Sequence, residues 1–341
     1  MNKKINKWWI IAFSVCIIFI NVFSNIAVNT INENTLSVLS KNKQFYLGGD
    51  SCGIKLLASG VLVMKIERDD LELKVGDIIL MANSESINTS ARLEEIVKES
   101  SGEEIKLLVS RENVTKEISA RPILDSLSSS YKLNIWVKDS TAGVGTITFY
   151  EKTNMMFAGL GHGVTETEEN YIVPIETGAI TSTDIYNIKK GFANDPGEVR
   201  GTVTNKIIGS IIKNTDKGIY GRIIDNSFVK NMEEINLADK NQIKEGKAQI
   251  VTSVNYGKKE YYDIEIQKVM LNSKGNKNMI IKVTDERLLN LTGGIIQGMS
   301  GSPIVQDGKL IGAVTFVLLN DPRVGYGVFI ENMLGDMEEI E

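Results

Sequence analysis

The sequence predicts a mainly β protein, in which an N-terminal membrane segment and a small α+β domain precede a larger β region. The first 28 residues join lysines to a long apolar run. Residues 61–120 contain β-rich runs and one amphipathic helix. From residue 131 onward, short β-like runs alternate with Gly, Asn and Asp turns. Many strands with few helices are typical of a barrel or a sandwich.

The composition limits the classes of function that the chain can have. Its 341 residues, 42% of them hydrophobic, suffice for two or three domains with sizeable cores. The net charge of -5 and the lack of a basic block argue against a nucleic-acid partner. One histidine and two cysteines without a CxxC motif exclude a multi-histidine or thiolate metal site. The sequence therefore predicts no metal and no cofactor.

The N-terminus, residues 1–28, is predicted to be a single-pass membrane anchor. Lys3, Lys4 and Lys7 precede an apolar run of roughly bilayer-spanning length, so the lysines would stay in the cytoplasm. A cleaved signal peptide is the alternative, although Asn25 is not the small residue expected before a cut after Ala27. A buried globular helix fits the flanking lysines poorly. Either favoured interpretation puts residues 30–341 outside the cytoplasm.

Residues 29–43 are polar and are predicted to be a linker, and residues 44–122 a compact α+β domain. Strands are expected at 61–66, 105–111 and 114–120, the last two as a hairpin, and residues 73–83 are expected to be a turn followed by a buried strand. Residues 89–98 are expected to be a helix with Leu93, Ile96 and Val97 on its buried face.

The run VGDIILMANSESI in this segment resembles the strand-turn-strand that precedes the helix of PDZ domains. Upstream, YLGGDSCGI looks like the carboxylate-binding loop and first strand of such a domain. PDZ domains bind an extended peptide by adding it to a sheet edge. The alternative is a packing module that binds nothing. The residues predicted to contact a peptide are Gly48, Gly49, Cys52, Gly53 and Ile54.

The run QGMSGSP, residues 297–303, is the first candidate for chemistry. Gly298 permits a tight turn that can aim the N–H groups of Gly298 and Ser300 into one pocket, as an oxyanion hole requires. Ser300 is then the predicted nucleophile, with Ser302 as a weaker candidate. Taken alone, the run could equally be a structural turn.

The only histidine of the chain, His162, stands in a second glycine-rich turn, AGLGHGV. A serine hydroxyl needs a neighbouring base to take its proton. A lone histidine in a turn is ordinarily a surface residue. The flanking glycines and the presence of Ser300 favour the interpretation of His162 as that base.

Asp285 is the preferred candidate for the acid that orients the histidine. It follows a strand-like run and lies 15 residues before Ser300. Asp184, Asp195 and Asp263 are its competitors, and Asp285 could equally cap a short helix that begins at Glu286.

Four runs together resemble the stage IV sporulation protein B serine peptidases of endospore-forming bacteria: GLGHGVTE, NDPGEVRG, VTDERLLNLTGGIIQGMSGSPIVQDGKLIGAVTF and NDPRVGYGVFIENML. The resemblance covers nearly the entire chain from about Tyr46. It implies a PDZ domain followed by a chymotrypsin-like double β-barrel, here residues 131–341. It also implies a catalytic set of His162, Asp285 and Ser300. Histidines expected in the family are replaced by Phe316 and Phe329, which leaves His162 as the only candidate base.

The family resemblance further implies a role in signalling between forespore and mother cell. The substrate would be a membrane-bound regulator of an intramembrane protease, and the peptidase would also cut itself near its N-terminus, where residues 29–43 are the obvious stretch. Such an enzyme is expected in the intermembrane space, anchored by its N-terminal segment, and its PDZ segment could mediate self-association.

A non-catalytic interpretation remains open from the sequence. The chain could be a PDZ adaptor on a β scaffold at the outer surface of the membrane, with a purely structural serine turn. It would then tolerate Ser300→Ala and fail when Gly48 or Gly53 is changed.

Overall fold

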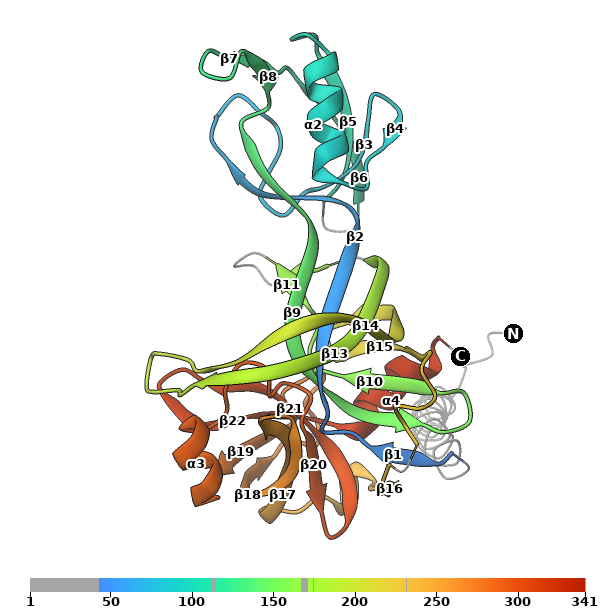
Figure 1. The fold of residues 1–341 in the computed structure, drawn as a ribbon, viewed down its shortest axis with the longest axis vertical. Coiled ribbons are helices and arrows are strands. Elements are labelled where there is room, and N and C mark those ends of the chain that lie inside the picture. The colour runs from blue at the N-terminus through green and yellow to red at the C-terminus, as the bar shows by residue number, and fades with distance from the viewer. Residues whose placement is uncertain (1–42, 112–113, 167–170, 174, 231, 341) are drawn as a thin grey trace, which may run out of the picture. The chain divides into compact units, whose positions relative to one another are not determined.

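The computed structural model describes residues 43–111, 114–166, 171–173, 175–230 and 232–340 (Figure 1). Strands dominate this part of the chain, which confirms the predicted mainly β class. The predicted membrane segment and nearly all of the predicted linker lie outside the described residues. Among the residues described, no helix is long and apolar enough to cross a membrane. The chain divides into Met1–Gln44 and Phe45–Glu341, and every helix and strand described lies in the second unit.

A first barrel closes through antiparallel pairs in the order β9–β10–β15–β14–β13–β2 and back to β9. Closure leaves these strands without an open edge within the ring. Ile54, Ile147 and Phe157 belong to its apolar core. The strands are β2 (Ser51–Ile66), β9 (Ile135–Glu151), β10 (Met156–Gly159), β13 (Ile175–Lys189), β14 (Glu198–Thr215) and β15 (Gly218–Ile223).

A second barrel closes in the same way, in the order β17–β18–β19–β22–β21–β20 and back to β17. Along β18, buried Tyr262, Ile264 and Ile266 alternate with exposed residues, as one inward face requires. The strands are β17 (Gly246–Asn255), β18 (Lys258–Val269), β19 (Met279–Val283), β20 (Pro303–Gln306), β21 (Lys309–Leu318) and β22 (Asp321–Phe329).

These two closed rings form the double β-barrel that the family resemblance implies. Helix α4 packs Met333 and Met337 into one apolar cluster with Phe45 and Leu47 of β1. β16 joins the two sheets, because it pairs antiparallel with β1 and parallel with β21. The remaining elements of this region are β1 (Phe45–Leu47), β11 (Thr165–Glu166), β12 (Tyr171–Ile172), β16 (Glu234–Leu237), η1 (Lys240–Gln242), α3 (Glu286–Thr292) and α4 (Ile330–Glu338).

A small α/β module is inserted in the chain between β2 and β9, and the outer part of this strand pair, Leu62–Ile66 with Ile135–Lys138, packs into the module's own apolar core. Leu93, Ile96 and Val97 of α2 are buried there, as the sequence predicts, and Thr89 caps the helix by accepting a hydrogen bond from the Arg92 N–H. The elements of the module are β3 (Ile78–Ala82), β4 (Glu85–Ser86), α2 (Ser90–Glu99), β5 (Ile105–Arg111), β6 (Val114–Ala120), β7 (Ile123–Asp125) and β8 (Ser130–Lys132).

The VGD run of this module has a structural role. Asp77 is fully buried, and its carboxylate accepts two hydrogen bonds of 2.7 Å from the Arg111 guanidinium. It also accepts a hydrogen bond of 2.8 Å from the Lys74 N–H, while Gly76 supplies the left-handed backbone of the turn (φ +92°). The motif therefore closes the turn that leads into β3.

The structure corrects the predicted start of the PDZ-like domain at residue 44. Residues 45–47 pair with β9, and residues 51–58 pair with β9 and β13, so both segments belong to the first barrel. The sequence-based boundary failed because the partners of these strands lie about a hundred residues away. The core of the module instead runs from Val61 to Val137.

Candidate active site

The serine loop joins α3 to β20 and depends on two left-handed glycines. Gly298 (φ +98°) and Gly301 (φ +91°) flank Ser300. A Cβ at Gly298 would lie 2.9 Å from the Val199 Cβ, and a Cβ at Gly301 would lie 2.1 Å from the Thr146 carbonyl oxygen. Both positions thus need glycine for backbone angle and for space.

Strand β9 of the first barrel holds the carbonyl groups of this loop. The Thr146 N–H donates to the Ser300 carbonyl at 3.0 Å, and the Thr146 hydroxyl donates to the Gly298 carbonyl at 2.8 Å. Among the described residues, the N–H groups of Gly298 and Ser300 have no hydrogen-bond acceptor. Two free donors in one tight loop are the requirement for an oxyanion hole.

The two serines of the loop differ in access. Ser300 is half-buried, and its hydroxyl donates to the Thr315 carbonyl at 2.9 Å. Ser302 is fully buried, and its Oγ has no hydrogen-bond partner in the described part of the chain. A substrate carbonyl cannot reach a hydroxyl without solvent access, so the geometry favours Ser300 over Ser302 as the nucleophile.

His162 follows β10 through a turn in which Leu160 and Gly161 adopt left-handed angles. Its Nδ1 lies 2.8 Å from the Gly163 carbonyl oxygen. Since a carbonyl can only accept, this bond places the proton of the neutral ring on Nδ1 and leaves Nε2 free to act as a base. Burial lowers the pKa of His162 below its ordinary value, which favours this neutral form near pH 7.

The structure brings the His162 loop and the Ser300 loop together against β21. The His162 ring stacks on Phe316, with 4.9 Å between the ring centroids. The carbonyl group of the neighbouring residue, Thr315, accepts the hydrogen bond from the Ser300 hydroxyl. A Cβ at Gly301 would lie 2.4 Å from the Leu160 nitrogen, so the backbones of the two loops are in contact. His162 and Ser300 make no direct hydrogen bond in the described structure.

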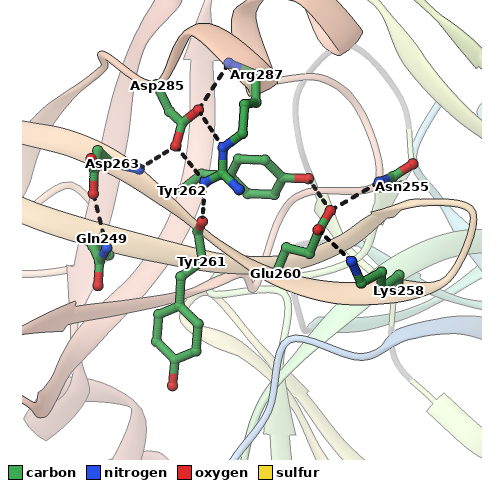
Figure 2. A network of polar contacts seen from close by, with 9 residues as sticks. All are labelled: Gln249, Asn255, Lys258, Glu260, Tyr261, Tyr262, Asp263, Asp285 and Arg287. Carbon is green, nitrogen blue, oxygen red and sulfur yellow. Dashed lines mark hydrogen bonds and ion pairs between the residues drawn. The ribbon is translucent and has the colours of Figure 1, made fainter.

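Asp285 lies in a different polar network, which Figure 2 shows. Its carboxylate caps α3 by accepting from the Arg287 N–H at 2.9 Å and also accepts from the Arg287 guanidinium at 2.7 Å. The Asp263 N–H donates to it at 3.2 Å. Arg287 holds the pKa of Asp285 below its usual range. Asp285 therefore takes the capping role that the sequence left open, and no hydrogen bond joins it to His162 among the described residues.

The competing acids are placed as follows. Asp263 accepts a hydrogen bond from the Gln249 side chain at 2.8 Å, close to Asp285 (Figure 2). Asp195 pairs with Lys189 at 2.7 Å. Asp184 lies exposed on β13, opposite Thr202 of β14. In the part of the chain that the structure describes, none of these three carboxylates accepts a hydrogen bond from His162.

The sequence did not reveal the contacts that strand β21 makes with Ser300 and His162. Thr315 and Phe316 contact Ser300 and His162, and the Thr315 hydroxyl donates to the Asn276 carbonyl at 3.2 Å. The Lys277 ammonium lies 5.2 Å from the centroid of the Phe316 ring. A threonine inside the apolar run GAVTF was a weak signal, because a polar residue in a buried strand usually has a specific partner.

The predicted peptide-binding residues of the PDZ-like segment do not lie in the α/β module. Gly53 and Ile54 pair with β9 and β13 of the first barrel, and Cys52 is buried in that barrel's core. A Cβ at Gly48 would lie 2.2 Å from the Ile147 carbonyl oxygen, and one at Gly49 would lie 2.8 Å from a Val251 methyl group. These glycines serve close backbone packing and not a carboxylate-binding loop.

The module has a hollow of its own, a cavity of about 670 Å³. Leu93 and Val97 of α2 line one side, and Trp136 and Val137 at the start of β9 line another. In the described structure this start of β9 pairs with β2 alone. A strand beside a helix, with a hollow between them, is the arrangement that peptide addition to a sheet edge requires.

Two closed β-barrels, with a glycine-flanked serine and a histidine brought together between them, define a serine endopeptidase. Residues 129–334 match the family described as SpoIVB peptidase S55, and the chain belongs to this family. No match was found among curated proteins.

Several solved structures resemble parts of the chain. The PDZ domain of the SdrC-like protein from Listeria monocytogenes is 18% identical, with a TM-score of 0.21, over 23% of this chain and 87% of that one. The active form of the Rv3671c protease from M. tuberculosis is 11% identical, with a TM-score of 0.34, over 57% and 72%. The HtrA-type protease AlgW with a decapeptide is 11% identical, with a TM-score of 0.37, over 86% and 65%.

Proposed function

We propose that Ser300 is the nucleophile and His162 the general base of this serine endopeptidase. The observation that carries the proposal is the convergence of both side chains on Thr315 and Phe316, next to two loop N–H groups without acceptors. Ser300 exchanges its bond to the Thr315 carbonyl for one to His162 Nε2 and attacks the substrate carbonyl. The N–H groups of Gly298 and Ser300 stabilise the oxyanion, and His162 then protonates the leaving amine.

Labelling by a fluorophosphonate probe tests this assignment. The full chain is expected to react at Ser300, and Ser300→Ala and His162→Ala are expected to abolish labelling, whereas Ser302→Ala keeps it. Mass spectrometry of the labelled peptide identifies the serine. Removal of such a nucleophile typically lowers kcat by about a millionfold. Undiminished peptide cleavage by Ser300→Ala would overturn the assignment of Ser300 as the nucleophile, whereas neither labelling nor cleavage by the wild-type chain would support the adaptor hypothesis.

We further propose that the enzyme works outside the cytoplasm, anchored to the membrane, in signalling during endospore formation. The proposal rests on the family match and on the lysine-flanked apolar run at the N-terminus. The substrate would be a membrane-bound regulatory protein, and a second substrate would be the chain itself.

Self-processing gives a direct test of the second substrate. The full chain, expressed in membranes, is expected to yield a product cut within residues 29–43, and Ser300→Ala is expected to remain intact. A product that forms equally in both would show that another protease makes the cut. Protease protection in intact cells checks the side of the membrane: residues 45–341 should be accessible from outside the cytoplasm.

A further inference from the structure

The turn between β14 and β15 lies directly against the His162 loop. β10 and β15 pair in antiparallel register, with Gly159 opposite Ile219. The pairing ends there, because Leu160 and Gly161 adopt left-handed angles, but the two segments stay in contact beyond it, with His162 and Asp216 between the contacting residues. Contacts on both sides support this: a Cβ at Gly163 would lie 2.5 Å from the Thr215 carbonyl oxygen, and a Cβ at Gly218 would lie 2.6 Å from the Gly159 carbonyl oxygen.

The residues around Asp216 are fixed by side-chain bonds. The Asn214 side chain accepts from the Val164 N–H and donates to the Val164 carbonyl, both at 2.9 Å, which ties the turn to the histidine loop. Asp336 of α4 accepts from the Thr215 hydroxyl at 2.5 Å and from the Lys217 ammonium at 2.7 Å. The turn is therefore held from two sides.

The Asp216 carboxylate itself accepts no hydrogen bond among the described residues. Only its carbonyl is used, as the acceptor of the Asn276 side-chain amide at 2.5 Å. Its nearest cation is the Lys217 ammonium at 3.9 Å, and that group already pairs with Asp336. A carboxylate without a hydrogen-bond partner, in a turn packed on the loop of the only histidine of the chain, is available to accept an imidazole N–H.

The other acids near the site are already engaged. The Asp285 carboxylate accepts from Arg287 and from the Asp263 N–H, and Asp336 is bound to Thr215 and Lys217. The charged groups that face this region are therefore Asp216, Lys217 and Asp336, together with Lys277 over the Phe316 ring.

We propose that Asp216, and not Asp285, is the positioning carboxylate of His162. The inference rests on the proposed role of His162 as the base. A rotation of the two side chains lets Asp216 replace the Gly163 carbonyl as the acceptor of the Nδ1 proton. Asp216 then fixes the tautomer with a free Nε2 and stabilises the imidazolium that forms when Nε2 takes the Ser300 proton. The Nδ1 proton stays on the ring throughout.

The single histidine makes a direct test possible. In the full chain labelled with ring-¹⁵N histidine, the imidazole signals belong to His162, so their pH titration gives its pKa in each variant. A carboxylate beside a histidine raises its pKa by about 1 to 3 units. Asp216→Asn is therefore expected to lower the pKa of His162 by about one unit or more. Asp285→Asn and the exposed control Asp184→Asn are expected to leave it unchanged.

Kinetics provide a second readout. Asp216→Asn is expected to lower kcat at least about a hundredfold with KM nearly unchanged, because an amide supports the wrong tautomer. Asp216→Glu is expected to recover part of the loss. An unchanged pKa of His162 in Asp216→Asn overturns the proposal, and so does a fall confined to Asp285→Asn. If the pKa falls but no probe labels Ser300, the pairing stands and the proposed peptidase role of Ser300 fails.

Discussion

At the scale of the residue, alanine substitutions at two glycines of the second barrel can distinguish a loss of stability through backbone strain from a loss of catalysis. Gly298 (φ +98°) and Gly308 (φ +73°) both have left-handed angles, so alanine at either costs about 1 kcal/mol of stability. A Cβ at Gly308 would meet nothing within 4 Å, whereas one at Gly298 would press on Val199.

We therefore expect Gly298→Ala to displace one proposed oxyanion donor and lower kcat about 100- to 1000-fold. Gly308→Ala should lose only the roughly 1 kcal/mol that the backbone angle costs and should keep its activity, whereas Gly298→Ala adds the contact with Val199 to the same backbone cost. Steady-state kinetics and thermal unfolding of the two variants check this. Equal losses of kcat in both would mean that the serine loop is sensitive to general strain and not to the position of its N–H group.

At the scale of the residue, the sequence was sufficient to select His162 and Ser300 as candidates, because a lone histidine and a serine that both stand in glycine-rich turns are typical of a catalytic pair. It could not predict Thr315 as the partner of the Ser300 hydroxyl, since that bond depends on how a loop packs on β21. The sequence did not single out Asp216 for a related reason: in the run NTDKG it is simply a turn residue, and only the packing of the turn between β14 and β15 on the His162 loop makes it a candidate.

At the scale of the element, Asp285 is the N-cap of α3 (Figure 2). Loss of such a cap costs about 0.5–2 kcal/mol. Asp285→Ala is therefore expected to lower the melting temperature, while the folded fraction keeps kcat within a fewfold of the wild type. Arg287→Ala is the matched control, because it removes the ion pair and leaves the cap. A thousandfold fall in kcat at an unchanged melting temperature would assign Asp285 to catalysis.

Helix α4 carries an acid whose charge opposes folding. Burial and the neighbouring Asp239 raise the pKa of Glu331 to about 7. A carboxyl whose pKa is higher in the folded than in the unfolded chain binds its proton more tightly when folded. Its contribution to stability is thus largest below about pH 4 and is lost as the pH rises through about 7.

Glu331→Gln should therefore stabilise the protein by about 1–3 kcal/mol at pH 8, by clearly less at pH 5 and hardly at all below about pH 4. The amide keeps an acceptor for the Lys240 N–H, which now donates to Glu331 at 2.8 Å. Glu339→Gln is the control, since Lys213 lowers the pKa of that exposed acid. Denaturant unfolding at these pH values is the measurement, and a gain of the same size at pH 5 would exclude the titration of Glu331 as the cause.

At the scale of the element, the sequence predicted local structure correctly and failed where strands pair with partners far away in the chain. Helix α2 and its buried face were correct because Leu93, Ile96 and Val97 repeat with the helical period within ten residues. The assignment of Gly53 and Ile54 failed because a strand carries no local sign of its partners, and β13 lies more than 120 residues further along the chain.

At the scale of the whole molecule, the first barrel needs a strand that precedes the α/β module. β2 closes the ring between β9 and β13 and contributes Ile54 and Leu56 to the core. A fragment of residues 131–341, which the sequence-based division treats as a complete peptidase domain, lacks this strand. It leaves the facing edges of β9 and β13 unpaired and part of the core exposed.

We therefore expect the fragment 131–341 to show no cooperative unfolding transition and no fluorophosphonate labelling, whereas residues 43–341 show both. A second variant separates ring closure from mere length. Because Leu57 pairs with Ser140, a short Gly-rich turn can replace residues 59–138 and join the two strands as a hairpin. This shorter chain keeps β2 and should regain cooperative unfolding. Cooperative folding of 131–341 alone, measured by calorimetry, would contradict the requirement for β2.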